Sequence, residues 1–101
     1  MITVRISADA VSCEGHSGYS EAGSDIVCAA VTSAMRYLAA LLDDTLALAP
    51  DIEVDDSRAR IRIASDRPEA RPAFQAFASL MREYQAEYPE FVQVRSSDRV
   101  I

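Results

Sequence analysis

The chain has no lysine, no tryptophan and no asparagine, and among its 101 residues there are one histidine and two cysteines. All ten basic residues are arginine, against sixteen acidic residues, and the net charge is −6. Proteins that bind nucleic acid generally carry an excess of basic residues, so the composition predicts no direct nucleic-acid partner. Two cysteines provide no disulfide framework, and in a chain expected in the cytoplasm they are expected to be free thiols.

The sequence also predicts neither a targeting signal nor a membrane-spanning segment. Residues 1–9 alternate between apolar and polar, whereas a signal peptide has a basic region followed by an apolar one. No apolar stretch approaches the length of a membrane span, which predicts no membrane partner and a cytoplasmic location. A chain of 101 residues that is 50% hydrophobic suits one compact domain. We expect that domain over residues 1–95 and a flexible C-terminal tail over residues 96–101.

Alternation of apolar and polar residues predicts two β-hairpins and a final strand. The first hairpin joins residues 2–8 to residues 11–15. The second joins residues 52–54 to residues 59–63, and its arginines are expected to face solvent and to pair with the acidic residues of the preceding strand. The final strand is predicted over residues 91–95.

Apolar residues spaced three to four positions apart predict two helices. The first covers residues 24–48, with Ser24 as its cap and Asp25 in its first turn. The second begins at Asp66-Arg67-Pro68, ends before Pro89, and carries a stripe of aromatic and Met side chains expected in the core. The order β-β-α-β-β-α-β predicts an α+β fold, a mostly antiparallel sheet of about five strands with two helices packed on one face.

The residues with chemical potential are concentrated in segment 15–31, which reads GHSGYSEAGSDIVCAAV. His16, the only histidine, precedes Cys28 by twelve residues, and a glycine-rich polar loop separates them. Cys28 falls in the first turn of the predicted helix, where backbone N–H groups and the helix dipole favour a thiolate. An imidazole within reach can exchange the thiol proton, so this pair has the groups needed for nucleophilic catalysis.

Other interpretations of these residues remain open at this point. A free cysteine in an apolar context is often a buried structural residue, and a Cys/His pair alone is a weak motif. Cys13, His16 and Cys28 are three potential zinc ligands, but zinc usually takes four, so we expect neither a metal nor a cofactor. Cys13 and Cys28 also lack the C-x-x-C spacing of a redox pair, and Cys13 is expected on a strand face.

Two polar residues near Cys28 also allow two roles each. Asp25 either orients His16 or simply favours the start of the helix. Thr32 lies one helical turn after Cys28, where its hydroxyl either orients the thiol or the substrate, or bonds to the preceding turn.

The segment resembles the signature of a bacterial family, the ribosomal-processing cysteine proteases (Prp). The resemblance rests on the element order and on Gly15-His16, Gly18-Tyr19, Gly23 and residues 25–31. It implies a cysteine endopeptidase that removes the N-terminal extension of large-subunit ribosomal protein number twenty-seven during ribosome maturation. The implied partner is the precursor of that protein, with apolar and aromatic residues near the cut. The sequence departs from the family at Ser17 and Thr32, where alanine and serine are common.

The resemblance also assigns roles to residues. It places the nucleophile on Cys28 and the general base on His16 as a catalytic dyad, with supporting roles for Gly15, Asp25 and Thr32. The loop 17–24 is then expected to order over the substrate through Ser17, Gly18, Tyr19, Gly23 and Ser24. N–H groups of the first helical turn are the expected donors to the oxyanion.

The alternative function, from a different class, is a non-catalytic ribosome-associated binding module. The quaternary structure is a separate expectation. Two helices on one small sheet leave an exposed sheet face or edge, and a homodimer, which the family also implies, is a common way to cover it.

Overall fold

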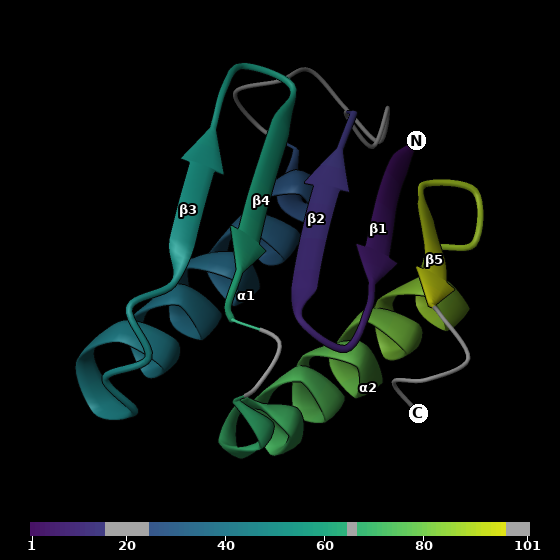
Figure 1. Cartoon of the computed structure of the whole chain (residues 1–101). Coiled ribbons are helices and arrows are strands. Elements are labelled where there is room, and N and C mark those ends of the chain that lie inside the picture. The colour runs from purple at the N-terminus through teal and green to yellow at the C-terminus, as the bar shows by residue number, and fades with distance from the viewer. Residues whose placement is uncertain (16–24, 65–66, 97–101) are drawn as a thin grey trace.

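The fold is one mixed sheet with two helices on one side, seen in a computed structural model that describes residues 1–15, 25–64 and 67–96 (Figure 1). The sheet has the strand order β3-β4-β2-β1-β5. Its strands are β1 Ile2–Ile6, β2 Ala10–Glu14, β3 Asp51–Val54, β4 Arg58–Arg62 and β5 Val92–Ser96. Helices α1 (Ile26–Ala40) and α2 (Arg71–Glu87) both lie behind the sheet in Figure 1, which confirms the predicted α+β fold.

Three of the four strand pairs are antiparallel, and the fourth, between β1 and β5, is parallel. The two predicted hairpins, β1–β2 and β3–β4, are both present. The chain leaves β4, crosses behind the sheet as α2 and returns as β5 on the far side of β1. This crossover adds one parallel pair to a sheet that is mostly antiparallel, as predicted.

The core lies between the sheet and the helices. Ile2, Val4 and Ile6 are buried on the helix side of β1, whereas Arg5 on the alternate face is exposed. The predicted stripe on α2 is confirmed in its first half, where Phe74 is 1% exposed. The other fully buried members of the stripe are Phe77 and Met81, while Tyr84 and Tyr88 are only half-buried.

The N-cap of helix α1 lies one residue later than predicted, and the helix ends differently. Asp25, not Ser24, is the N-cap, because its side chain accepts hydrogen bonds from the first turn. The α-helix gives way to a π-helical turn, η2 (Leu41–Thr45), and the chain then turns through Ala47 and Ala49, which both have positive φ. The second helix is preceded by a short 3-10 turn, η3 (Pro68–Ala70), so Pro68 starts it as expected.

The continuous helical segment Ile26–Thr45 is long and apolar enough, by length and composition, to cross a membrane. The expectation that no such stretch exists is therefore wrong. Frequent alanines and leucines produce this hydropathy, and the core helix of a soluble protein passes the same test. In the fold, Val27, Val31, Met35 and Leu38 of this segment are buried in the core.

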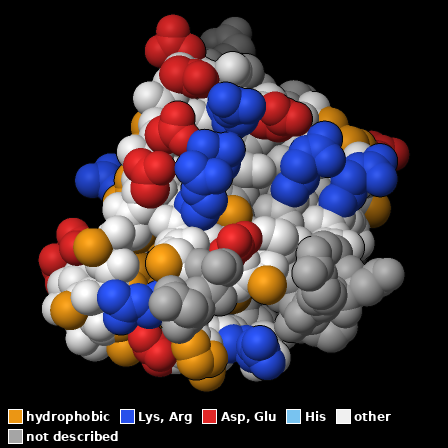
Figure 2. Space-filling model, in the orientation of Figure 1, with side chains coloured by type: hydrophobic (Ala, Val, Ile, Leu, Met, Phe, Trp, Pro, Cys, Tyr) orange, Lys and Arg blue, Asp and Glu red, His pale blue; other side chains and the backbone are white. Residues whose placement is uncertain are grey.

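The face of the sheet that no helix covers is charged (Figure 2). Arg60 forms an ion pair with Glu53, and Arg62 forms one with Asp51 at 3.7 Å, which confirms the predicted cross-strand pairing. Such exposed pairs stabilise a fold by less than about 1 kcal/mol each. Ser96, predicted as the first residue of the tail, is the last residue of β5, and residues 97–101 lie outside the described part of the chain.

Candidate active site

Cys28 lies in the first turn of α1, half-buried, at a pocket of about 280 Å³. The pocket opens between the first half of α1 and the ends of β2, β3 and β4. Gly15 and Thr32, two of the predicted supporting residues, line it together with Cys28. The structure therefore brings these three residues to one cavity. Its remaining walls are partly apolar, with Val31, Met35, Val54 and Ala59 among them.

Asp25 fixes the backbone of Cys28. Its side chain is buried, and Oδ1 accepts hydrogen bonds from the N–H of Val27 at 3.0 Å and of Cys28 at 2.9 Å. The Ala29 N–H donates to the Asp25 carbonyl oxygen at 3.1 Å. Asp25 thus favours the start of the helix, one of its two predicted roles. These three N–H groups bond to Asp25 in this structure, and the donors to an oxyanion stay a prediction.

Gly15 is needed for its backbone. Its φ is +90°, and a Cβ at this position would lie 2.5 Å from the Met1 carbonyl oxygen. The Gly15 N–H donates to the Ser57 carbonyl oxygen at 2.8 Å. This bond ties the end of β2 to the turn between β3 and β4, so the turn becomes a wall of the pocket.

That turn is itself organised by Asp55. Its Oδ1 accepts hydrogen bonds from the N–H groups of Ser57 and Arg58, each at 2.9 Å. These bonds, the one from Ser57 first, hold the pKa of the Asp55 carboxyl below its usual value. Asp55 and Asp56 are both among the residues that line the pocket that holds Cys28. Sequence reasoning identified this turn but not its role, because only the pairing of β4 with β2 brings it to the site.

The pocket contains both cysteines of the chain. Both are free thiols and both line the pocket. Burial raises the pKa of the Cys13 thiol to about 12, so Cys13 is protonated at neutral pH. Because the thiolate is the nucleophilic form, Cys13 is unsuited to attack a substrate.

Several predicted site residues lie outside the described part of the chain. They are His16 and the loop residues Ser17, Gly18, Tyr19, Gly23 and Ser24. Their roles stay predictions. Within residues 1–15, 25–64 and 67–96, no group of three or more His, Cys, Asp or Glu side chains is placed to hold a metal ion.

An α+β domain whose helix presents a half-buried thiol to a partly apolar pocket fits a cysteine hydrolase that accepts a peptide side chain. Comparison with family models supports this class. The model of the cysteine protease Prp matches residues 1–93 of the chain. The chain therefore belongs to the Prp family and is a cysteine protease, which favours an enzyme over a non-catalytic binding module.

Solved structures agree with this assignment. A crystal structure of an essential ribosomal processing protease Prp from S. aureus, with a covalently linked product peptide, has a TM-score of 0.87 and 26% identity. The match covers 96% of this chain and 100% of the S. aureus chain. A second S. aureus Prp structure, with a substrate peptide, has a TM-score of 0.82, 25% identity and the same coverage.

A third structure shares the fold. SMU.848 from Streptococcus mutans has a TM-score of 0.71 and 24% identity, and the match covers 95% of this chain and 93% of that chain. A comparison with curated proteins found no match.

Proposed function

We propose that the chain is a cytoplasmic endopeptidase that removes the N-terminal extension of large-subunit ribosomal protein number twenty-seven during ribosome maturation. The relatives' ribosomal processing activity and their bound substrate and product peptides support this proposal. The observation on which it chiefly depends is the placement of Cys28 at the start of α1 and in the wall of the pocket. The partner is then the precursor of that ribosomal protein.

The chemistry uses a dyad. Cys28, as a thiolate, attacks the carbonyl carbon of the scissile peptide bond, and His16 protonates the departing amine. Water then hydrolyses the resulting thioester, with His16 as the base, and the free thiol is restored. The cap formed by Asp25 holds the Cys28 backbone in place, which reduces the cost of ordering the nucleophile for attack.

The pocket supports specificity for an apolar side chain next to the cut. Its apolar wall is formed by Val31 and Met35 of α1 and by Val54 and Ala59 of the β3–β4 hairpin. A volume of about 280 Å³ is close to the lower end of the range for ligand pockets and is sufficient for one aromatic or aliphatic residue. The expected substrate is therefore an extended peptide with apolar and aromatic residues near the cleaved bond.

The test is cleavage of the host's precursor protein by the purified chain, followed by mass spectrometry of the new terminus. Cys28→Ala should abolish cleavage, and His16→Ala should slow it by about a hundredfold or more, the usual scale for a positioned base. Cys13→Ser is the matched control and should retain most activity, because the Cys13 thiol is protonated. Cleavage retained by Cys28→Ala would refute the mechanism.

The proposal includes a homodimer. The open face of the sheet is charged and carries its own ion pairs, so it is poorly suited to bury against a second copy. The better surface is an apolar groove of about 200 Å³ between α1 and α2, which has Tyr37 and Leu41 on one side and Ala76 and Leu80 on the other.

A further inference from the structure

The two edges of the sheet differ in whether their outward-facing backbone groups have hydrogen-bond partners. At the β5 edge, the Val94 N–H donates to Gln85 Oε1 of α2 at 2.6 Å, so a side chain blocks pairing there. At the other edge, β3 pairs with β4 alone, and no described residue bonds to its outer side. An edge strand with free backbone groups is a template for another extended chain.

The direction of the β3 peptide groups follows from one hydrogen bond. The Asp55 N–H donates to the Arg58 carbonyl oxygen at 2.8 Å. Because bonded pairs alternate along an antiparallel ladder, Glu53 and Asp51 also bond to β4. The N–H and C=O groups of Ile52 and Val54 therefore point to the open edge.

The side chains of β3 add an apolar contact surface. Ile52 is 45% exposed and Val54 is 73% exposed, and both are among the few large hydrophobic residues of the described chain that solvent reaches. Val54 also lines the pocket that contains Cys28, as do Asp55 and Asp56 of the following turn. The open edge is thus continuous with the active-site pocket.

From these observations we propose that the open edge of β3 binds the substrate as an added β-strand, which delivers the scissile bond to Cys28. This inference rests on the proposed function and names the recognition element of the same site. A protease needs its substrate extended, and strand addition holds a peptide in that form through main-chain hydrogen bonds. At about 3.3 Å per residue, β3 has room for about four substrate residues beside the pocket.

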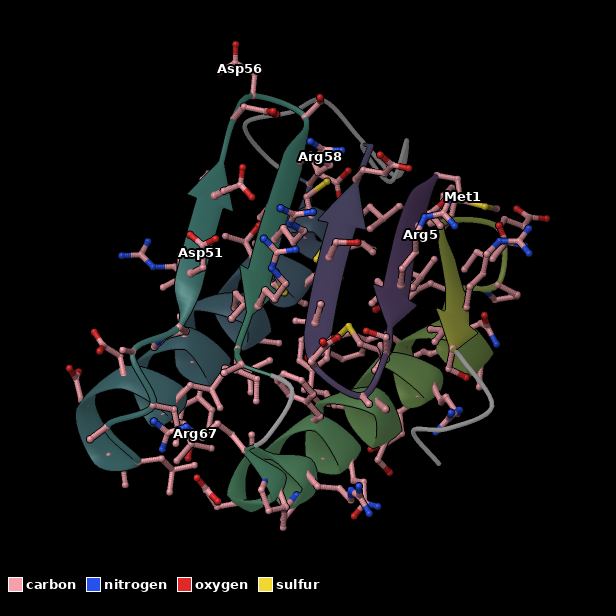
Figure 3. All side chains as sticks on the ribbon, viewed as in Figure 1. Met1, Arg5, Asp51, Asp56, Arg58 and Arg67 are labelled. Carbon is pink, nitrogen blue, oxygen red and sulfur yellow. The ribbon has the colours of Figure 1, made fainter. Side chains whose placement is uncertain are left out.

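The charge of β3 indicates which chain it accepts. Four of the six residues in segment 51–56 are acidic. Glu53 and Asp51 pair with arginines of β4, whereas Figure 3 shows Asp56 at the tip of the turn, apart from Arg58. A second copy paired at this edge by a two-fold axis would bring acidic side chains opposite one another, which is destabilising. A substrate segment with basic side chains on that face is complementary. The inferred ligand is therefore an extended segment of the ribosomal protein precursor that alternates basic and apolar residues.

The experiment uses full-length Cys28→Ala protein and a labelled peptide spanning the extension and the first mature residues of the host's precursor. Backbone amides of the peptide are N-methylated one at a time, and affinity is measured by fluorescence anisotropy. Methylation should weaken binding by about tenfold or more at alternate residues only, because alternate amides face β3. Losses with no period of two would overturn the inference.

A protein variant gives an independent measurement. Ile52→Pro removes an outward N–H while staying compatible with an edge strand, and it should raise KM about tenfold or more. Ile52→Thr keeps the N–H and the β-branch but loses the same apolar side chain, so a KM raised several-fold more in Ile52→Pro than in Ile52→Thr isolates the contribution of the outward N–H. Light scattering of Ile52→Pro should leave the oligomeric mass unchanged, and dissociation would assign the edge to a second copy instead. If wild-type protein cleaves the peptide but no periodicity appears, this inference fails while the proposed function stands.

Discussion

Cys13 shows at the scale of one residue what burial does to the pKa of a thiol. The pKa of this thiol is about 12 in the folded chain, against 9.0 for an unperturbed thiol. Between these values the unfolded chain loses the proton and the folded chain keeps it, so the unfolding free energy falls as pH rises above about 9. The loss due to Cys13 should reach about 1.4 kcal/mol near pH 10 and should be absent below about pH 8.

Urea unfolding at both pH values measures this effect. Cys13→Ala is the control, because every other titrating group is retained and only the contribution of Cys13 is removed. The variant should show a smaller loss of unfolding free energy than the wild type between the two conditions. An equal loss in both proteins would mean that Cys13 titrates normally and is available as a thiolate.

Asp25 marks a limit of sequence reasoning at the same scale. Ser and Asp are about equally good N-caps, so the adjacent pair Ser24 and Asp25 did not identify which residue starts the helix. The structure selects Asp25, whose carboxylate bonds the N–H of Cys28 itself. The approximate position of the thiol at a helix start was predictable, whereas the occupation of its own N–H was not.

The end of the first helix shows the limits at the scale of an element. The 3–4 periodicity predicted a helix to residue 48, but the chain leaves α-helical geometry at Leu41 and passes through Ala47 at a φ of 53°. No glycine or asparagine, the usual residues for left-handed backbone, signals this turn. The parallel pairing of β1 with β5 was also not predictable from the sequence, because alternation of apolar and polar residues within a strand does not encode the direction of the neighbouring strand.

Ala47 carries the strain of that turn. A left-handed conformation costs a residue with a Cβ about 1 kcal/mol relative to glycine. Ala47→Gly should therefore raise the unfolding free energy by about 0.5–1 kcal/mol, despite the larger entropy of glycine in the unfolded chain. The matched control, Ala40→Gly in exposed α-helix, should lower it by about 1 kcal/mol. Denaturant titration measures the free energy of unfolding of both variants. A lower value in Ala47→Gly than in the wild type would exclude strain at Ala47.

At the scale of the whole molecule, local sequence patterns were sufficient to predict the layers of the fold. They were not sufficient to predict which residues line the active-site pocket. The segment 15–31 gave the nucleophile candidate and its helix. The opposite wall comes from the β3–β4 turn, forty residues and more along the chain from Gly15, and it reaches the pocket through the bond from Gly15 to Ser57. Register across three strands determines that contact, and no single segment contains the information.

The assembly of two chains is the remaining property at this scale. Tyr37 is 72% exposed beside the apolar groove between α1 and α2, and an aromatic side chain of that size gains most from burial at an interface. We expect light scattering to give the mass of a dimer at tens of micromolar. Tyr37→Glu places a charge in the groove and should give a monomer, because an unpaired charge is costly to bury. Arg36→Glu makes a larger change of charge at the adjacent exposed position and should leave the dimer intact. A monomer mass for the unmodified chain would remove the dimer from the proposal, and a dimer in Tyr37→Glu would move its interface away from this groove.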